Sequence, residues 1–278
     1  MFALREPVGT DIYYSPSKDS LLKEVEASIE HPFGPGQIKT EKFIASVVPH
    51  DRITLSGPTA AWVYASIEKK NYIIIGPNHN QIGTKFAVMR EGIWKTPLGE
   101  VAVDTDIAQK MIEEVELVQY DVLAHKNEHA IEVQLPFLQY RFGNDFKIVP
   151  MLITNSFRDV DFIAACVDIG KRIAGIIRAD TANWGIIGTS DMSSGALDVQ
   201  RKADKILVRA ILSLKPTKIF EAVDSTNAHI CGYGAMITTI AAAKELGAKK
   251  AKLLQYTSSY DILQEASSVT GYASLIIY

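Results

Sequence analysis

Apolar runs that alternate with helical segments are the strongest constraint on the fold of this chain. The run Ile73-Ile74-Ile75 and the segments 146–153 and 184–188 contain hardly any polar residues, which is typical of strands covered on both faces. The segments between such runs carry apolar residues at helical spacing. This order predicts an α/β protein with a central mixed sheet covered by helices on both faces.

The boundaries of the elements follow from periodicity, turn residues and caps. We expect helices at 18–31, with Ser17 as N-cap, and at 58–70, 105–115, 128–142, 157–177, 197–214 and 232–247. We expect strands at 43–50, 71–79, 146–153, 251–260 and 272–278, and a strand together with its loop at 184–194. No linker rich in Pro, Gly or Ser interrupts the chain, so residues 1–278 are predicted to form a single domain.

The composition argues against several classes of protein. The chain is 47% hydrophobic and 22% charged, with a formal net charge of −3 and no basic run, so a nucleic-acid partner is not expected. The N-terminus lacks the pattern of a secretory signal, and no stretch approaches the roughly 18 apolar residues that a membrane span needs. We therefore expect a cytoplasmic protein without a membrane partner.

Three predicted strands finish in reactive side chains, namely His50, His79 and Asp191. Ligands of open α/β sheets bind at the carboxyl ends of the strands. Pro49 and Pro77 stiffen the backbone just before the two histidines, and such pre-positioning suits a metal ligand or a general base. For either histidine alone, an imidazole bonded to nearby backbone is the simpler interpretation, and the matching positions favour a shared site.

Two further segments carry candidate residues. Cys231 stands just before a predicted helix, whose N-terminus favours the thiolate that binds metals and attacks electrophiles. Cys166, within an apolar helix, is predicted to be a buried packing residue. If a helix starts near Asn127, His129 and Glu132 share a face at i, i+3, a geometry known from metal sites. A solvated first turn of a helix produces the same spacing.

The order of these motifs resembles that of a known family. "REPV", "YYSP", "GPNHN", "AHKNEHAIEVQLPFLQ", "GTSDMS" and "ICGYGAM" resemble the MEMO family, also called protein B of the AmmeMemoRadiSam system. The match runs from about Arg5 to the C-terminus. The resemblance implies a fold similar to that of the class III, LigB-type extradiol dioxygenases, which are non-haem iron enzymes that cleave catechols.

The resemblance also implies a metal site and partners. The metal positions of the family fall on His50, His79 and Cys231, with Asp191 close by and His129 available to the substrate. Two imidazoles and a thiolate suit a divalent transition metal, and the related enzymes favour iron(II) over copper or zinc. A small-molecule or peptide ligand is expected in the cleft, and AMMECR1-like and radical SAM proteins of the same system are candidate partners.

The chain departs from the family pattern at two places. Family members usually read Pro-His-Ala-Gly-Tyr where this chain has Pro49-His50-Asp51-Arg52-Ile53, so charge is added beside the first ligand position. The histidine that usually follows the aspartate of "GTSD" by three residues is Ser194 here. A general acid or base drawn from that histidine would be missing, so we expect little cleavage of simple catechols.

Three functions therefore compete. The first is a metal-dependent redox or dioxygenase-like enzyme, with His50, His79 and Cys231 holding iron or copper and with catalytic roles for Asp191 and His129. The second is a non-catalytic binding or adaptor protein that keeps the cleft for a peptide, a small anionic ligand or a protein partner. The third is a hydrolase that uses Cys231 with His50 or His79 as base, although no known hydrolase motif accompanies it.

Overall fold

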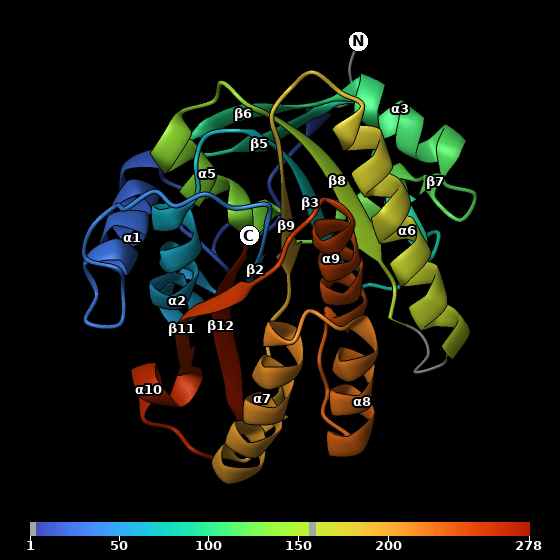
Figure 1. The fold of residues 1–278 in the computed structure, drawn as a ribbon. Coiled ribbons are helices and arrows are strands. Elements are labelled where there is room, and N and C mark those ends of the chain that lie inside the picture. Colours follow the sequence, from blue (N-terminus) through green and yellow to red (C-terminus); the bar gives the residue numbers. More distant parts are fainter. Residues whose placement is uncertain (1–3, 156–159) are drawn as a thin grey trace.

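Four parallel strands form the centre of the sheet. The structure is a computed structural model that describes residues 4–155 and 160–278. In this described part of the chain, twelve strands form one sheet (Figure 1). Its centre has the order β8 (Lys147–Ile153), β3 (Asn71–Pro77), β9 (Trp184–Thr189) and β2 (Ala45–Val48), and all four run in the same direction. The carboxyl ends of these strands therefore share one edge.

Further strands, both parallel and antiparallel to their neighbours, extend this centre on both sides. Beyond β2 lies β12 (Val269–Ile277), which pairs with β2, with β11 (Ala251–Ser258) and with the short β10 (Ser194–Gly195). The remaining strands lie on the β8 side: β6 (Gly99–Val103), β5 (Ile93–Thr96), β1 (Leu4–Arg5), β4 (Phe86–Val88) and β7 (Gln119–Tyr120). The sheet is therefore mixed, as predicted.

Helices cover both faces of the sheet, which confirms the predicted α/β class. One face carries α2 (Ile53–Ser66) and α5 (Leu135–Phe142), with α1 (Lys18–Glu30) packed outside α2. The other face carries α9 (Tyr233–Glu245), which packs against α6 (Val160–Arg178), and also α7 (Leu197–Leu212). The shorter helices are α3 (Thr105–Glu114), α4 (Val122–Lys126), the 3₁₀ helix η1 (Glu132–Gln134), α8 (Pro216–Thr226) and α10 (Ser259–Leu263).

Several boundaries differ from those predicted. The helix expected at 128–142 starts later, as η1 followed by α5, because the Glu128 side chain accepts a hydrogen bond from the backbone of Ala130 and holds the preceding segment in a turn. The strand expected at 251–260 ends at Ser258, whose side chain caps α10. The sequence patterns also missed the antiparallel pair β5–β6 and helix α8.

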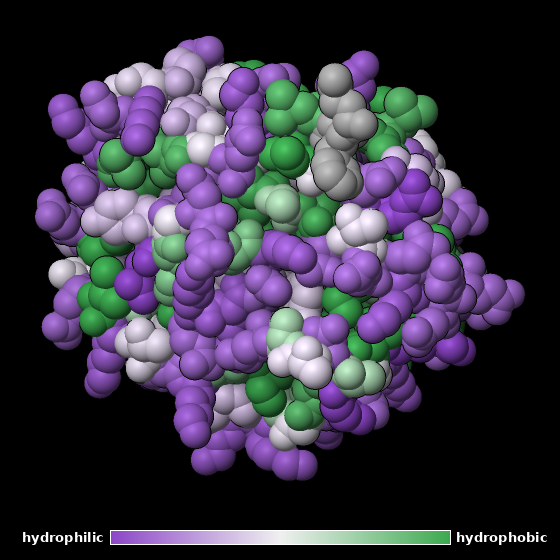
Figure 2. Space-filling model, turned by 90° about the horizontal axis from the view of Figure 1, so that it is seen from above, coloured by the Kyte–Doolittle hydropathy of each residue, from purple (hydrophilic) through white to green (hydrophobic). Residues whose placement is uncertain are grey.

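Close packing fixes α9 against the sheet. The strand residues Ile73, Ile74 and Ile187 are fully buried. Gly188 faces α9 so closely that a Cβ atom there would lie 2.4 Å from Oγ1 of Thr239. Apolar side chains thus concentrate between the layers, whereas hydrophilic residues dominate the surface seen from the top of Figure 1 (Figure 2). Among the described helices, none has the length and apolarity to cross a bilayer.

Candidate functional site

The predicted residues meet at the carboxyl edge of the parallel strands. His50 follows β2, Asp191 follows β9 and His79 follows β3. Since β9 lies between β2 and β3, the three side chains leave the sheet next to one another. Their convergence is the direct result of three parallel strands running in register.

Cys231 reaches the same place from α9. Gly232 lets the start of this helix approach the end of β9, because a Cβ atom there would lie 2.6 Å from the carbonyl oxygen of Thr189. The backbone N–H of Gly232 donates to Oγ of Ser190 at 3.0 Å. The Cys231 sulfur consequently lies 3.3 Å from Nε2 of His50, although the two residues are 181 positions apart.

His50 is buried, with its side chain 1% exposed. Its Nδ1 lies 2.8 Å from Oγ1 of Thr189, which leaves Nε2 for the cluster. Burial, together with the nearby rings of His79 and His129, holds the pKa of His50 well below its usual value. The imidazole is therefore neutral at neutral pH, as metal coordination requires.

Glu128 contacts both the ring and the backbone of His79. Its carboxylate lies 2.9 Å from Nδ1 of the His79 ring and accepts the backbone N–H of His79 at 2.6 Å. Burial lowers the pKa of His79, but interactions with Cys231 and Glu128 outweigh this effect and raise the pKa to about 10. A carboxylate bonded to the remote nitrogen of a histidine is the arrangement that orients metal-binding imidazoles.

His129 lies against His79 in an aromatic stack. The ring centroids of His79 and His129 are 4.8 Å apart, and Tyr13 stacks on His129 at 3.8 Å. Burial is the main cause that lowers the pKa of His129 to about 4. The ring is thus neutral at physiological pH and has little freedom to turn. The sequence patterns did not identify Tyr13 as part of the site.

Asp191 joins the cluster through His50. One carboxylate oxygen accepts the backbone N–H of His50 at 2.9 Å, and the other lies 3.9 Å from Nε2 of the same residue. Burial, followed by the charge of Asp51, raises the pKa of Asp191 to about 7. Asp51 itself accepts a hydrogen bond from the Tyr272 hydroxyl at 2.6 Å. Asp191 therefore lies in an environment that disfavours its charge.

The cluster offers two overlapping sets of metal donors. The donor atoms of His50, His79 and His129 lie within 4.8 Å of one another, and so do those of His50, Asp191 and Cys231. His50 belongs to both sets. Metal–nitrogen and metal–sulfur bonds of about 2.0–2.3 Å place cis ligands about 3–4 Å apart, so small side-chain adjustments would bring these atoms around one ion.

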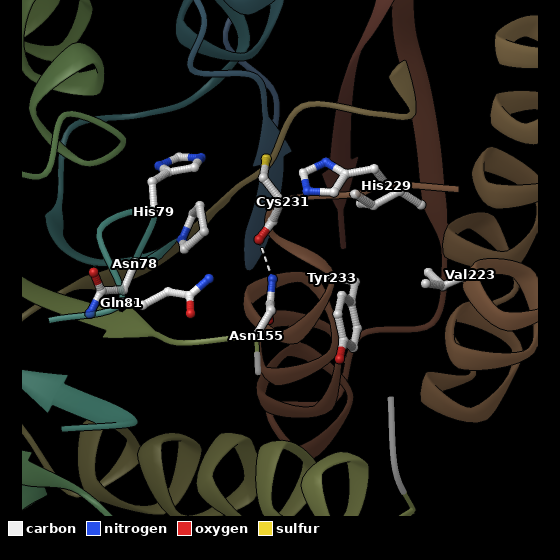
Figure 3. Close-up of a pocket in the computed structure, with 10 residues that line it drawn as sticks. Asn78, His79, Gln81, Asn155, Val223, His229, Cys231 and Tyr233 are labelled. Atoms are coloured by element: carbon white, nitrogen blue, oxygen red, sulfur yellow. Dashed lines mark hydrogen bonds between the residues drawn. The ribbon is translucent and has the colours of Figure 1, made fainter. Parts of the chain in front are cut away.

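Two cavities adjoin the cluster and share His79, His229 and Cys231. One, of about 340 Å³, is also lined by Tyr13, Asp51 and Ser194. The other measures about 310 Å³, and there His79 and His229 lie on either side of the Cys231 sulfur (Figure 3). The sequence patterns predicted no role for His229, yet its side chain lines both cavities.

Ser194 lies at the rim of the larger cavity. Its side chain is exposed, and its hydroxyl is 3.1 Å from that of Thr270. An antiparallel bridge pairs Ser194 with His229, so the position where the family pattern has a histidine does face the site. Cys166, by contrast, is buried in α6, as predicted.

Neither of the two interpretations of the His129–Glu132 spacing, a shared metal-binding face or a solvated first turn, holds in the structure. Glu132 points away from the cluster and pairs with the buried Arg5, and it also accepts the hydroxyl of Tyr14 and the backbone N–H of Gly9. Because no regular helix spans 129–132, the i, i+3 spacing does not bring the two side chains together.

Arg5 of "REPV" connects the N-terminal segment to the segment that contains "EHAIE". It donates to the carbonyl oxygens of His125 and Glu128 as well as to Glu132. The N-terminal segment thereby fixes the loop that carries Glu128 and His129. The sequence patterns gave Glu128 no role, although its place beside a candidate ligand in "NEHA" was an available clue.

Comparison with known proteins agrees with this architecture. A MEMO1 family protein of Nitrosopumilus maritimus is 35% identical, and one of Methanococcus vannielii is 37% identical; the alignments cover 98% and 99% of both chains. The crystal structure of uncharacterized protein JW3007 from Escherichia coli K12 matches 84% of this chain and 100% of that chain with a TM-score of 0.58. Its 13% identity indicates a shared fold alone. The model of a family described as Memo-like protein matches residues 5–276, and the chain therefore belongs to that family.

Proposed function

We propose that this protein is a metal-dependent redox protein of a dioxygenase-like kind, in which His50, His79 and Cys231 hold one divalent transition metal. The observation that carries the proposal is the convergence of two imidazoles and a thiol from three separate parts of the chain. The Cys231 sulfur lies 3.3 Å from Nε2 of His50, and the ring centroids of His50 and His79 are 5.1 Å apart. Clusters of titratable groups with shifted pKa values are typical of functional sites.

The donor set fits iron(II), copper or zinc, and the family resemblance favours iron(II). Imidazole and thiolate suit all three metals, whereas magnesium and calcium prefer oxygen. The buried His50 is already neutral. His79, with a pKa raised to about 10 by Cys231 and Glu128 against the effect of burial, must lose its proton on binding. Metal uptake is therefore expected to release protons and to weaken as the pH falls.

Other residues of the chain orient the metal ligands and contact the substrate. Bound iron or copper would supply redox chemistry to a substrate in the cleft. Glu128 orients His79 through the 2.9 Å contact with Nδ1, and Asp191 is placed either to complete the ligand set or to orient a metal ligand. His129, neutral and stacked under Tyr13, presents a fixed hydrogen-bonding edge to the substrate.

A non-catalytic binding role is the second candidate, and Ser194 is the observation that favours it. Its hydroxyl cannot exchange protons near neutral pH as an imidazole can. The cavity would then hold a small molecule or a peptide without transforming it. AMMECR1-like and radical SAM proteins remain the partners that the family resemblance proposes under either candidate.

Elemental analysis of protein purified without chelators tests the metal site. We expect about one Fe, Cu or Zn per chain in the wild type and a clear loss in the double variant Cys231→Ser, His79→Ala. His31→Ala, which removes a half-buried histidine from another part of the chain, serves as the matched control. If wild type and double variant carry equal metal, the site does not bind metal.

An activity assay on metal-free protein separates the hydrolase hypothesis from the metal hypothesis. The 3.3 Å contact between Cys231 and His50 also fits a thiol paired with a base. Esterase or amidase turnover that persists in metal-free protein and disappears after alkylation of Cys231 would favour the hydrolase. Turnover that occurs only when metal is bound would exclude the hydrolase.

A further inference from the structure

The loop that carries Asp191 has a buried anchor outside the metal site. Asp191, Met192 and Ser194 all line the larger cavity, whereas Ser193 between them points the other way, into the protein, and is 1% exposed. Residues 191–194, here called the aspartate loop, therefore have one side on the candidate site and one side on the core.

Asp204 of α7 binds the inner side of this loop. One of its carboxylate oxygens accepts the backbone N–H of Ser193 at 2.8 Å and also the Ser193 hydroxyl. The other oxygen accepts the Tyr256 hydroxyl at 2.8 Å and the side-chain amide of Gln200. One carboxylate thus ties the aspartate loop to α7 and to β11.

Strand β12 leaves the loop little room to move. The backbone of Gly271 donates to the Ser193 carbonyl oxygen at 3.0 Å and accepts from the Met192 N–H at 2.9 Å. A Cβ atom on Gly271 would lie 1.8 Å from a carboxylate oxygen of Asp204. The carboxylate and the strand therefore enclose Ser193, and movement of either would displace the loop.

Stability alone does not account for the burial of Asp204. The residue is 1% exposed, and no basic side chain in the described part of the chain forms an ion pair with it. Burial raises its pKa, which the hydrogen bonds from Ser193 and Tyr256 oppose. Apolar residues in a core usually stabilise a fold at least as well as such a buried polar group does.

We propose that Asp204 is a positioning residue of the candidate metal centre, since it fixes the aspartate loop so that Asp191 stays beside His50 and Cys231. The inference rests on the proposed function. Asp191 meets His50 through a 2.9 Å hydrogen bond and a 3.9 Å contact, and a displacement of about 1 Å would break the first. Asp204 acts on the centre only through this loop.

Graded variants test the role of Asp204. Asp204→Ala removes every acceptor, Asp204→Asn retains one, and Tyr256→Phe removes a single donor. Asp198→Asn, an exposed carboxylate on the same helix, is the matched control. In the asparagine variant the Gln200 oxygen, which has no hydrogen-bond partner among the described residues, can accept from the new amide if the Gln200 amide flips, so a partial rescue is expected.

Two readouts are measured at a temperature where all variants are folded. Cobalt(II) titration followed by visible absorption reports affinity and ligand geometry. We expect Asp204→Ala to raise the cobalt Kd on the order of 10-fold, as loss of supporting residues around metal ligands does, and to shift the absorption bands. Asp204→Asn and Tyr256→Phe should have smaller effects in the same direction. Hydrogen exchange of the Met192 and Ser193 amides in metal-free protein should accelerate in the same order.

The outcomes distinguish this inference from the proposed function. Unchanged cobalt affinity and spectrum in folded Asp204 variants would overturn the inference and leave the metal site standing. If the wild type binds no cobalt, the proposed function fails. Amide exchange then tests the anchoring of the aspartate loop by Asp204: faster exchange in the Asp204 variants supports the anchoring, and unchanged exchange overturns it. Should Asp204→Ala not fold, Asp204→Asn and Tyr256→Phe decide by the same criteria.

Discussion

Replacing Glu128 by glutamine should weaken metal binding without unfolding the protein. In the described part of the chain, one carboxylate oxygen lies 2.9 Å from the His79 ring nitrogen, accepts the Ala130 backbone N–H at 2.9 Å and lies 3.4 Å from Nδ1 of His129. The other oxygen accepts the His79 backbone N–H at 2.6 Å. A glutamine amide has one oxygen and one NH₂ group, so in either orientation its NH₂ group opposes a donor. The amide must shift, and His79 must shift with it.

The size of the effect follows from the role of Glu128. Loss of a carboxylate that orients a metal-binding histidine typically lowers metal affinity about 10–100-fold, which corresponds to about 1.4–2.7 kcal/mol. The pKa of His79 should change as well. Burial lowers this pKa, whereas Cys231 and Glu128 raise it to about 10, so removal of the Glu128 charge should move it down in metal-free protein.

Two measurements check this prediction. Isothermal titration with cobalt(II) or zinc gives the change in Kd, and NMR titration of the metal-free protein gives the pKa of His79. Glu265→Gln, at an exposed carboxylate, is the matched control and should leave both values unchanged. A folded Glu128→Gln protein with wild-type metal affinity and an unchanged pKa of His79 would refute the argument that Glu128 orients this ligand.

Three further predictions concern catalysis, pH and stability. Iron(II)-loaded wild type should consume little oxygen with catechol or protocatechuate, and Ser194→His should consume more, since a positioned histidine typically contributes about 10²–10⁴-fold to proton transfer; rapid uptake by the wild type would contradict this. Because burial and Asp51 raise the pKa of Asp191 to about 7, its stabilising contribution is present below pH 4 and is lost as the pH rises through 7. The free energy of unfolding of metal-free wild type should thus fall relative to that of Asp191→Asn, by on the order of 4 kcal/mol, and parallel curves in urea titrations would refute it. Arg5→Met should cost about 3–5 kcal/mol of unfolding free energy because it leaves the buried Glu132 without its cation; the double variant Arg5→Met, Glu132→Gln should recover part of this loss.

The sequence by itself determined the class of fold and the general place of the site. Fully apolar runs such as 73–75 can be buried only in a sheet covered on both faces, and the edge at which parallel strands end is common to all of them. His50, His79 and Asp191 could therefore be grouped before any coordinates were known. The family motifs added Cys231, which no periodicity would have linked to them.

Only the tertiary structure decided which side chains face one another. Glu132 and His129 are three residues apart, yet one meets Arg5 and the other meets Tyr13, because the chain turns between them instead of forming a regular helix. Glu128 reaches His79 across 49 positions, and Asp204 reaches Ser193 from the next helix. Such contacts depend on where backbone segments come to lie relative to one another and on the rotamers that packing then permits, and local sequence patterns carry no record of either.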